Sequence, residues 1–366
     1  MKGKEAIDAW HAWKSNVDVD QLDMGSHRLL PLLYRNLHTE GVEDPLMAKF
    51  KGVYRHTWYK NQMLFHKMAD VLDEFHNTGI RTMILKGAAL TVLHYRDYGL
   101  RPMADFDLLV STEQAPAAIG LLTKLGWTPT EKPLEAINEA YISVAHAAAF
   151  EDVSDLQIDL HWHTFSECCY PNADDDFWKD KVEANIHGVQ THALNPTDQL
   201  LHVCVHGARW NLVSPLRWVA DAMMIMNTSL SEIDWNRLVT QAQKRYCILP
   251  LKDTMDYLRD LLNAPIPLSI MERIGNIHIS KNAERIEYWA RNHLVRLMGG
   301  LPDFFARYRR YSWMVRTAGL SNQPIGFLRY LQYIWGADHL WHVPFYATLK
   351  GFRRIWDTGR WYVNRK

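Results

Sequence analysis

The chain has 366 residues, which is enough for two or three domains with a sizeable buried core. Apolar residues make up 48% of it and aromatic residues 12%, and this composition excludes an intrinsically disordered protein. Basic and acidic residues both number 41, so the net charge of zero indicates no particular partner, and the four cysteines have no spacing typical of a disulfide framework or a zinc site. Because the first residues lack the apolar core of a signal peptide and no run is long enough to span a bilayer, we expect a cytoplasmic protein.

Helices are predicted from about residue 5 to residue 77, because apolar residues recur there at three- and four-residue spacing. The apolar run at residues 83–85 then predicts a short strand that ends in Lys86 and Gly87. Glycine at such a junction allows a tight turn and a close approach of the backbone to a phosphate. A helix is expected to follow, from residue 88 to residue 94.

A second strand is predicted at residues 105–110, and it begins with two acids, Asp105 and Asp107. Positions two apart on a strand project from the same face, so the two carboxylates are expected side by side. Adjacent like charges raise each other's pKa unless a cation is shared between them, and a divalent metal supplies that charge. An isolated pair of this kind is more often two solvent-facing acids at a strand end.

A third strand is predicted at residues 156–162, where Gln157, Asp159 and His161 share one face by the same alternation. It adds a third carboxylate and favours a metal site. The order of strands and helices predicts a mixed α/β (α+β) fold, a small sheet with flanking helices. Residues 141–150 fit either a further strand or a short helix.

The segment after the predicted sheet is helical, with His202 and His206 four residues apart and therefore on one helical face. Buried structural histidines and substrate-contacting histidines are equally compatible with this spacing, and zinc is disfavoured because no glutamate lies between them. Arg217 and Asp221 are also four apart, and a salt bridge between them is favoured over phosphate binding by the arginine. Thr197 is expected to cap the first of these helices, and the acids at residues 174–176 are expected in a solvated turn.

The segment 291–366 is basic and aromatic. It has 13 basic and 3 acidic residues, a balance of 13 − 3 = +10, so the first 290 residues carry (41 − 13) − (41 − 3) = −10. Helices packed on the acidic remainder are favoured over a membrane-surface helix, with nucleic-acid binding last and at most weak peripheral membrane contact. We therefore divide the chain into an N-terminal helical region (1–77), a core (78–170), a second helical domain (171–290) and this tail.

Four motifs together resemble the uncharacterised nucleotidyltransferase family of bacteria, a branch of the polymerase-beta-like superfamily. They are Lys86-Gly87, Gly99-Leu-Arg101-Pro, Asp105-x-Asp107-Leu-Leu-Val and Ile158-Asp-Leu-His161-Trp. The resemblance covers about residues 25 to 225. The superfamily pattern has serine after the glycine and a shorter spacer to the acids, whereas this chain has Ala88 and a longer spacer.

The resemblance implies transfer of an NMP from an NTP to a hydroxyl, with release of pyrophosphate and dependence on two Mg²⁺ ions. It implies that Asp105, Asp107 and Asp159 bind the metal and carry out catalysis. It also implies that nucleotide and phosphate are bound by Lys86, Gly87 and Arg101. The residues implied to contact the acceptor are His161, His202, His206 and Arg217. A small molecule or a peptide or protein side chain is favoured as acceptor over nucleic acid. The alternative is an inactive nucleotide-binding or interaction module that keeps the fold.

Overall fold

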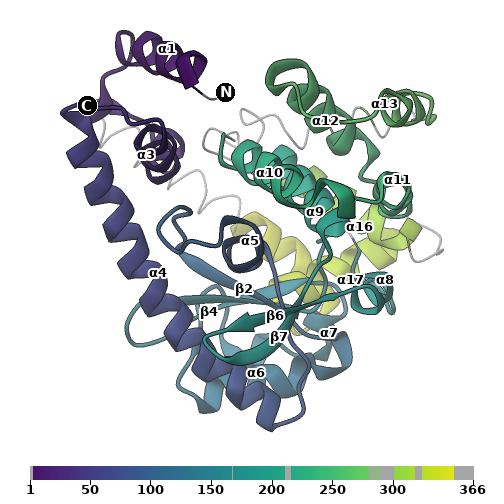
Figure 1. The fold of residues 1–366 in the computed structure, drawn as a ribbon. Coiled ribbons are helices and arrows are strands. Elements are labelled where there is room, and N and C mark those ends of the chain that lie inside the picture. Colours follow the sequence, from purple (N-terminus) through teal and green to yellow (C-terminus); the bar gives the residue numbers. More distant parts are fainter. Residues whose placement is uncertain are drawn as a thin grey trace, which may run out of the picture.

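A computed structural model describes residues 3–166, 168–210, 216–279, 281, 284, 287, 301–317 and 324–349. This part of the chain has a mixed α/β fold that is mostly helical, with a seven-stranded sheet of order β3-β4-β5-β2-β1-β7-β6 (Figure 1). The predicted fold class is therefore confirmed. The strands are β1 (Met83–Ile84), β2 (Asp105–Leu109), β3 (Thr128–Pro129), β4 (Ala147–Glu151), β5 (Gln157–His161), β6 (Val182–Ile186) and β7 (Val189–Ala193).

The two strands that carry the predicted acids lie side by side at the centre of the sheet. β2 pairs with β5 in parallel, and Asp107 stands directly opposite Asp159. On its other side β2 pairs antiparallel with β1, and the amide of Leu85 donates a hydrogen bond to the carbonyl of Asp107 at 3.0 Å. This bond brings Lys86, the next residue, beside the acids.

Alternation along β2 separates an apolar core on one face of the sheet from polar side chains on the other. Phe106 and Leu108 are fully buried in a core shared with α4 (Leu46–Asn77), α6 (Ala115–Lys124) and α7 (Glu139–Ile142). The opposite face belongs to a second core, and in Figure 1 its helices α9, α10 and α12 lie above the sheet. The helices of this second core are α5 (Lys86–Leu90), α8 (Asp175–Lys179), α9 (Pro196–Trp210), α10 (Leu216–Ser229), α11 (Trp235–Lys244), α12 (Ile248–Leu262) and α13 (Leu268–Gly275).

The N-terminal segment forms helices, as predicted. α1 (Gly3–Lys14), α2 (Met24–His27) and α3 (Leu30–Thr39) precede α4, and Trp10, Leu30 and Phe50 form a third, small core among them. α4 ends at Asn77, close to the expected position. The described part of the chain also contains short helical turns: η1 (Val19–Gln21), η2 (Thr91–Tyr95), η3 (Thr112–Gln114), η4 (Leu134–Ala136), η5 (Leu230–Glu232) and η6 (Leu340–His342).

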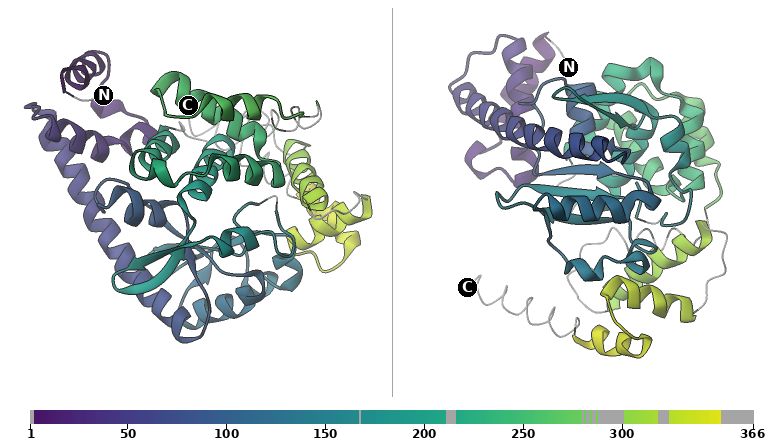
Figure 2. Two further views of the ribbon diagram at one scale, coloured as in Figure 1. Left: turned by 45° about the vertical axis from the view of Figure 1, so that its right-hand side comes forward. Right: turned by 90° about the horizontal axis from the view of Figure 1, so that it is seen from below.

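The described part of the tail packs on the sheet domain. α16 (Leu301–Thr317) and α17 (Pro324–Trp335) lie together at one end of the sheet (Figure 2), and Tyr311, Phe327 and Tyr330 are buried in the same core as Phe106. Residues 350–366, with several of the basic positions, lie outside the described residues. Among the helices that the structure describes, none is both long and apolar enough to cross a membrane.

Several local predictions are corrected. Residues 141–150 contain both candidate elements, the end of α7 and then β4. Thr197 does not cap α9: its hydroxyl accepts a hydrogen bond from the amide of Asp234, and the Asn195 side chain receives the amide of Asp198 at 3.0 Å instead.

Candidate active site

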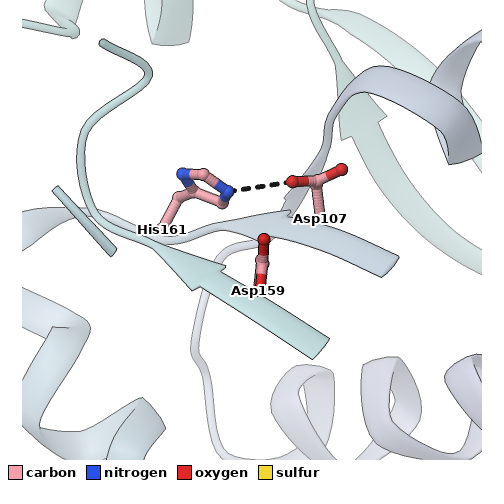
Figure 3. A group of neighbouring side chains, drawn as sticks. All are labelled: Asp107, Asp159 and His161. Atoms are coloured by element: carbon pink, nitrogen blue, oxygen red, sulfur yellow. Dashed lines mark hydrogen bonds and ion pairs between the residues drawn. The ribbon is translucent and has the colours of Figure 1, made fainter. Parts of the chain in front are cut away.

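Asp107, Asp159 and His161 form a compact group of possible metal ligands on the polar face of the sheet (Figure 3). One ligand atom from each residue lies within 4.8 Å of the others, and His161 Nε2 is 3.0 Å from Asp107 Oδ1. Asp107 and His161 are buried, whereas Asp159 is partly exposed. The group arises from strand register, because Asp107 and Asp159 are partners across β2 and β5 and His161 is two residues further along.

Lys86 compensates part of the negative charge. Its ammonium lies 2.5 Å from Asp107 Oδ1. Burial alone would raise the pKa of Asp107, but Lys86 and the hydrogen bond with His161 outweigh it and hold that pKa well below its usual value. Burial and the charge of Asp107 raise the pKa of Asp159. The two carboxylates therefore have unequal proton affinities. Among the described residues, Asp107 has ion-pair partners in Lys86 and His161, whereas Asp159 has none.

Asp105 is not a member of this group. It lies at the start of β2 on the same face and lines the same cavity, but the residue that joins Asp107 and Asp159 within ligand distance is His161. The predicted trio of acids is thus brought to one cavity, while the closest cluster consists of two of these acids and a histidine that we had placed on the acceptor side.

A cavity of about 190 Å³ opens over the acids between the sheet and helices α9 and α10. Its wall includes His202 and His206 from α9 and Arg217 from α10, so the structure brings these residues to the same cavity as Asp107. Burial lowers the pKa of His206 to about 3 and that of His202 well below its usual value, with Lys86 adding to both effects. Both imidazoles are neutral at pH 7 and can donate or accept a hydrogen bond.

The predicted salt bridge between Arg217 and Asp221 is wrong. Asp221 is buried and receives two hydrogen bonds of 2.9 Å from Arg101, as well as one of 2.9 Å from the Tyr95 hydroxyl. Arg217 instead reaches the carbonyl of Pro102 at 3.5 Å, the outer limit of a hydrogen bond. Arg101, expected to bind phosphate, is therefore held by Asp221, and Arg217 is the arginine that faces the cavity with its guanidinium unpaired by a carboxylate in the described chain.

Gly87 is required by this arrangement for a steric reason. A Cβ atom at this position would lie 2.4 Å from Arg101 Nη1, closer than real contacts allow. The left-handed backbone conformation falls one residue earlier, on Lys86, with φ of 42°. We expected a phosphate to approach the backbone of Gly87 closely, but in the structure the guanidinium of Arg101 occupies that position.

Asp174 is a residue whose structural role was missed. It is buried, its Oδ2 is 2.9 Å from His163 Nδ1, and its Oδ1 accepts the amide of Thr164 at 3.1 Å. Burial alone would raise the pKa of Asp174, but the hydrogen bonds with His163 and Thr164 lower it overall. The predicted solvated turn is therefore wrong at this position, and the carboxylate fixes the loop that follows β5. In the sequence, the run of adjacent acids is the only feature that points to this position of Asp174.

These features define a mixed α/β protein with paired carboxylates on neighbouring parallel strands beside a Lys-Gly turn, as expected for the class of nucleotidyltransferases. The chain belongs to the family of uncharacterised nucleotidyltransferases, whose model matches residues 24–263. The resemblance inferred from the motifs is thus confirmed. No curated protein matches the chain. A similar solved structure is that of an antigenic nucleotidyltransferase-like protein from Paracoccidioides brasiliensis, with 15% identity, a TM-score of 0.34, and coverage of 57% of this chain and 96% of that one.

Proposed function

We propose that the protein is a metal-dependent nucleotidyltransferase, which moves an NMP from an NTP to a hydroxyl and releases pyrophosphate. The observation that carries the proposal is the pairing of Asp107 with Asp159 across β2 and β5, with His161 beside them, in a chain of this family. Like charges this close, with one carboxylate buried and the other partly exposed, destabilise the fold unless a cation is shared between them. A pair of this kind is therefore better explained by ligand binding than by structure.

The residues fit a divalent cation. Asp107 and Asp159 supply the carboxylate oxygens that Mg²⁺ prefers, and His161 offers a nitrogen from the same group. The raised pKa of Asp159 marks the excess negative charge that a cation would relieve. Mg²⁺ would supply charge neutralisation at the phosphates and activation of the acceptor hydroxyl. A second ion would require Asp105, which lines the same cavity.

The remaining groups of the cavity fit a triphosphate. Lys86 and Arg217 carry positive charge on its wall and would bind phosphate oxygens. In the reaction, an acceptor oxygen forms a bond to the α-phosphorus, and the bond from that phosphorus to the bridging oxygen breaks. Pyrophosphate leaves with the electron pair, and the hydroxyl proton passes to solvent water. Lys86 and Arg217 would stabilise the charge that develops on the leaving pyrophosphate.

The test is calorimetric titration of the full chain with ATP, GTP, CTP and UTP, with and without Mg²⁺, followed by measurement of pyrophosphate release. We expect metal-dependent binding of at least one nucleotide, and we expect Asp107→Asn and Asp159→Asn to abolish turnover without unfolding the protein. Asp260→Asn is the control, because Asp260 is exposed and far along the chain on α12. An Asp107→Ala variant with full activity would refute the assignment.

An inactive nucleotide-binding or interaction module is the second candidate. It is favoured by the ion pair of Lys86 with Asp107, which already neutralises one acid, and by Ala88 in place of the expected serine. Nucleotide binding that is indifferent to Mg²⁺, with no pyrophosphate released in the presence of a cell extract, would support this candidate over the enzyme.

A further inference from the structure

His161 belongs to the compact group of possible ligands, but its side chain does not line the cavity of the paired carboxylates. The described residues that line this cavity include Asp107 and Asp159, whereas His161 lines a neighbouring cavity that shares Lys86 with the first. His161 is also only 3% exposed. Its proximity to the acids therefore does not by itself make it a ligand of an ion bound between them.

The hydrogen bond between His161 and Asp107 fixes which of the two groups holds the hydrogen. His161 Nε2 lies 3.0 Å from Asp107 Oδ1, and the ammonium of Lys86 lies 2.5 Å from the same oxygen. A carboxylate paired with an ammonium is ionised and can only accept, so Nε2 is the donor. A ring nitrogen that carries hydrogen has no lone pair left to bind a metal ion.

The second ring nitrogen of His161 is not open to an ion either. Nδ1 is a buried atom with no hydrogen-bond partner in the described structure, and it has almost no surface through which a ligand could reach it. In Figure 3, Nε2 is turned toward Asp107 and the other ring nitrogen points away from that residue. Neither nitrogen is thus placed to bind an ion that Asp107 and Asp159 share.

The two oxygens of the Asp107 carboxylate differ in their surroundings. Oδ1 accepts the hydrogen bonds of both Lys86 and His161. Oδ2 accepts none from the described residues, and it is not one of the buried atoms that lack a partner, so it keeps accessible surface in the cavity that Asp107 lines. Figure 3 shows this oxygen on the side of the carboxylate that is turned away from His161. Oδ2 is therefore the oxygen that an ion can reach.

The ring of His161 is held in its orientation from two sides. His161 ends β5 opposite Leu109, and its carbonyl accepts a hydrogen bond from the amide of Val110 at 2.9 Å. Its ring packs edge to face on the ring of His146, with 5.5 Å between the centroids. A side chain that is fixed in this way can fix the group to which it donates.

We propose that His161 is a positioning residue and not a metal ligand. Together with Lys86 it holds Oδ1 of Asp107, and it thereby turns Oδ2 toward the metal ion. This inference rests on the proposed function, and it removes the nitrogen of His161 from the ligands considered there. The ion then binds carboxylate oxygens of Asp107 and Asp159, which suit hard cations such as Mg²⁺ and Mn²⁺ better than Zn²⁺.

The experiment uses the full chain with Mn²⁺, whose unpaired electrons make the bound ion visible to electron paramagnetic resonance. Spin-echo spectra of bound Mn²⁺ show a strong modulation from nitrogen when an imidazole coordinates the ion. We expect no modulation of that strength from the parent protein. This measurement needs no variant, so it tests the inference even where a substitution at His161 prevents folding.

Two variants separate the donor from the ring. His161→Gln keeps a hydrogen-bond donor close to the position of Nε2, whereas His161→Phe keeps the ring and removes the donor. We expect His161→Phe to raise the Kd for Mn²⁺, measured by calorimetry, by about tenfold or more, as is typical for loss of a group that orients a ligand. His161→Gln should recover most of this loss and bind Mn²⁺ within about threefold of the parent.

His192→Phe is the matched control. His192 is partly buried and donates from Nδ1 to the carbonyl of Thr82 at 3.0 Å, but it is not among the residues that line the cavity of the acids. This variant loses a ring and a hydrogen bond of the same kind, and its Kd for Mn²⁺ should equal that of the parent. Circular dichroism melting curves report whether each variant is folded.

Three results would overturn the inference while leaving the proposed function intact. A strong nitrogen modulation in the parent that disappears in His161→Gln would make His161 a ligand. An unchanged Kd in His161→Phe would leave His161 without a role at the ion. A His161→Gln variant that binds as weakly as His161→Phe would show that the donor is not what matters. A parent protein that binds neither Mn²⁺ nor Mg²⁺ would instead contradict the proposed function, and the inference with it.

Discussion

Removal of the buried carboxylate at Asp221 should destabilise the fold strongly. The side chains of Arg101 and Asp221 are 7% and 5% exposed, and two hydrogen bonds of 2.9 Å join them. Asp221→Asn keeps the shape but leaves the guanidinium charge without a counterion. Breaking a buried ion pair by removing one partner costs about 3–5 kcal/mol. Because Tyr95 also donates to Asp221, the variant loses part of a second interaction, and we expect a value within that range.

The assay is urea unfolding followed by circular dichroism, with the slope compared between variants so that only the midpoint reports stability. Asp260→Asn is the matched control: Asp260 pairs with Arg259 at 3.0 Å, but its side chain is 59% exposed. An exposed pair contributes about 0–1 kcal/mol, so this variant should unfold almost as the parent does. Replacing both buried partners, as Arg101→Met with Asp221→Leu, should recover much of the loss, because no unpaired charge remains.

An Asp221→Asn variant that unfolds within about 1 kcal/mol of the parent would refute this reasoning, since it would place the pair in the range of exposed ion pairs. It would imply that water reaches the Arg101 guanidinium. The close fit of Arg101 against Gly87 would then also need revision.

Three further predictions follow from the same geometry. Gly87→Ala should lower the free energy of unfolding in urea by about 1–3 kcal/mol, because the added Cβ would clash with Arg101. Gly120→Ala in helix α6 should be neutral or stabilising, because a Cβ there meets no other atom. Equal stability of the two variants would contradict the steric argument. Asp159→Asn should stabilise the chain at pH 7 in the presence of a chelator, because the raised pKa of Asp159 in the folded state means that the ionised carboxylate opposes folding above the pKa of the unfolded state. The gain in stability should vanish at low pH, where Asp159 is protonated in both the folded and the unfolded state. A loss of stability at pH 7 would refute this prediction. Removal of residues 300–366 should make the chain insoluble by exposing the core that α16 and α17 cover, and a truncated chain that stays soluble, monomeric and equally heat-stable would show that the tail is an appendage.

The faces of the strands were predictable from the sequence because strand alternation is local. Period-two spacing placed Asp105 with Asp107 and Asp159 with His161, and the structure keeps both placements. The compact group also depends on which strands are neighbours. β2 and β5 are about fifty residues apart in the chain and pair in parallel, and no local pattern specifies that register. The sequence therefore predicted which residues line the cavity, but not that Asp107, Asp159 and His161 form its compact group.

The errors share a physical cause. The spacing of Arg217 and Asp221 predicts a helical pair worth only about 0.3–0.5 kcal/mol, and a buried partner from another element outweighs it. Asp221 pairs with Arg101, 120 residues away, and Asp174 with the loop after β5. In each case burial makes an unpaired carboxylate costly, so the nearest buried donor becomes the partner regardless of sequence separation.

Lys86 shows how the fold and the candidate chemistry depend on each other. A left-handed conformation at a residue other than glycine costs about 1–2 kcal/mol, and such strain persists where the surroundings fix it. Two contacts do so here: the amide of Leu85 binds the carbonyl of Asp107 just before the strained residue, and the ammonium of Lys86 binds the carboxylate of that same aspartate. Glycine at this position would remove the strain but also the charge. The strained lysine places a cation in the cavity of the paired carboxylates, where the proposed reaction needs one for the leaving pyrophosphate.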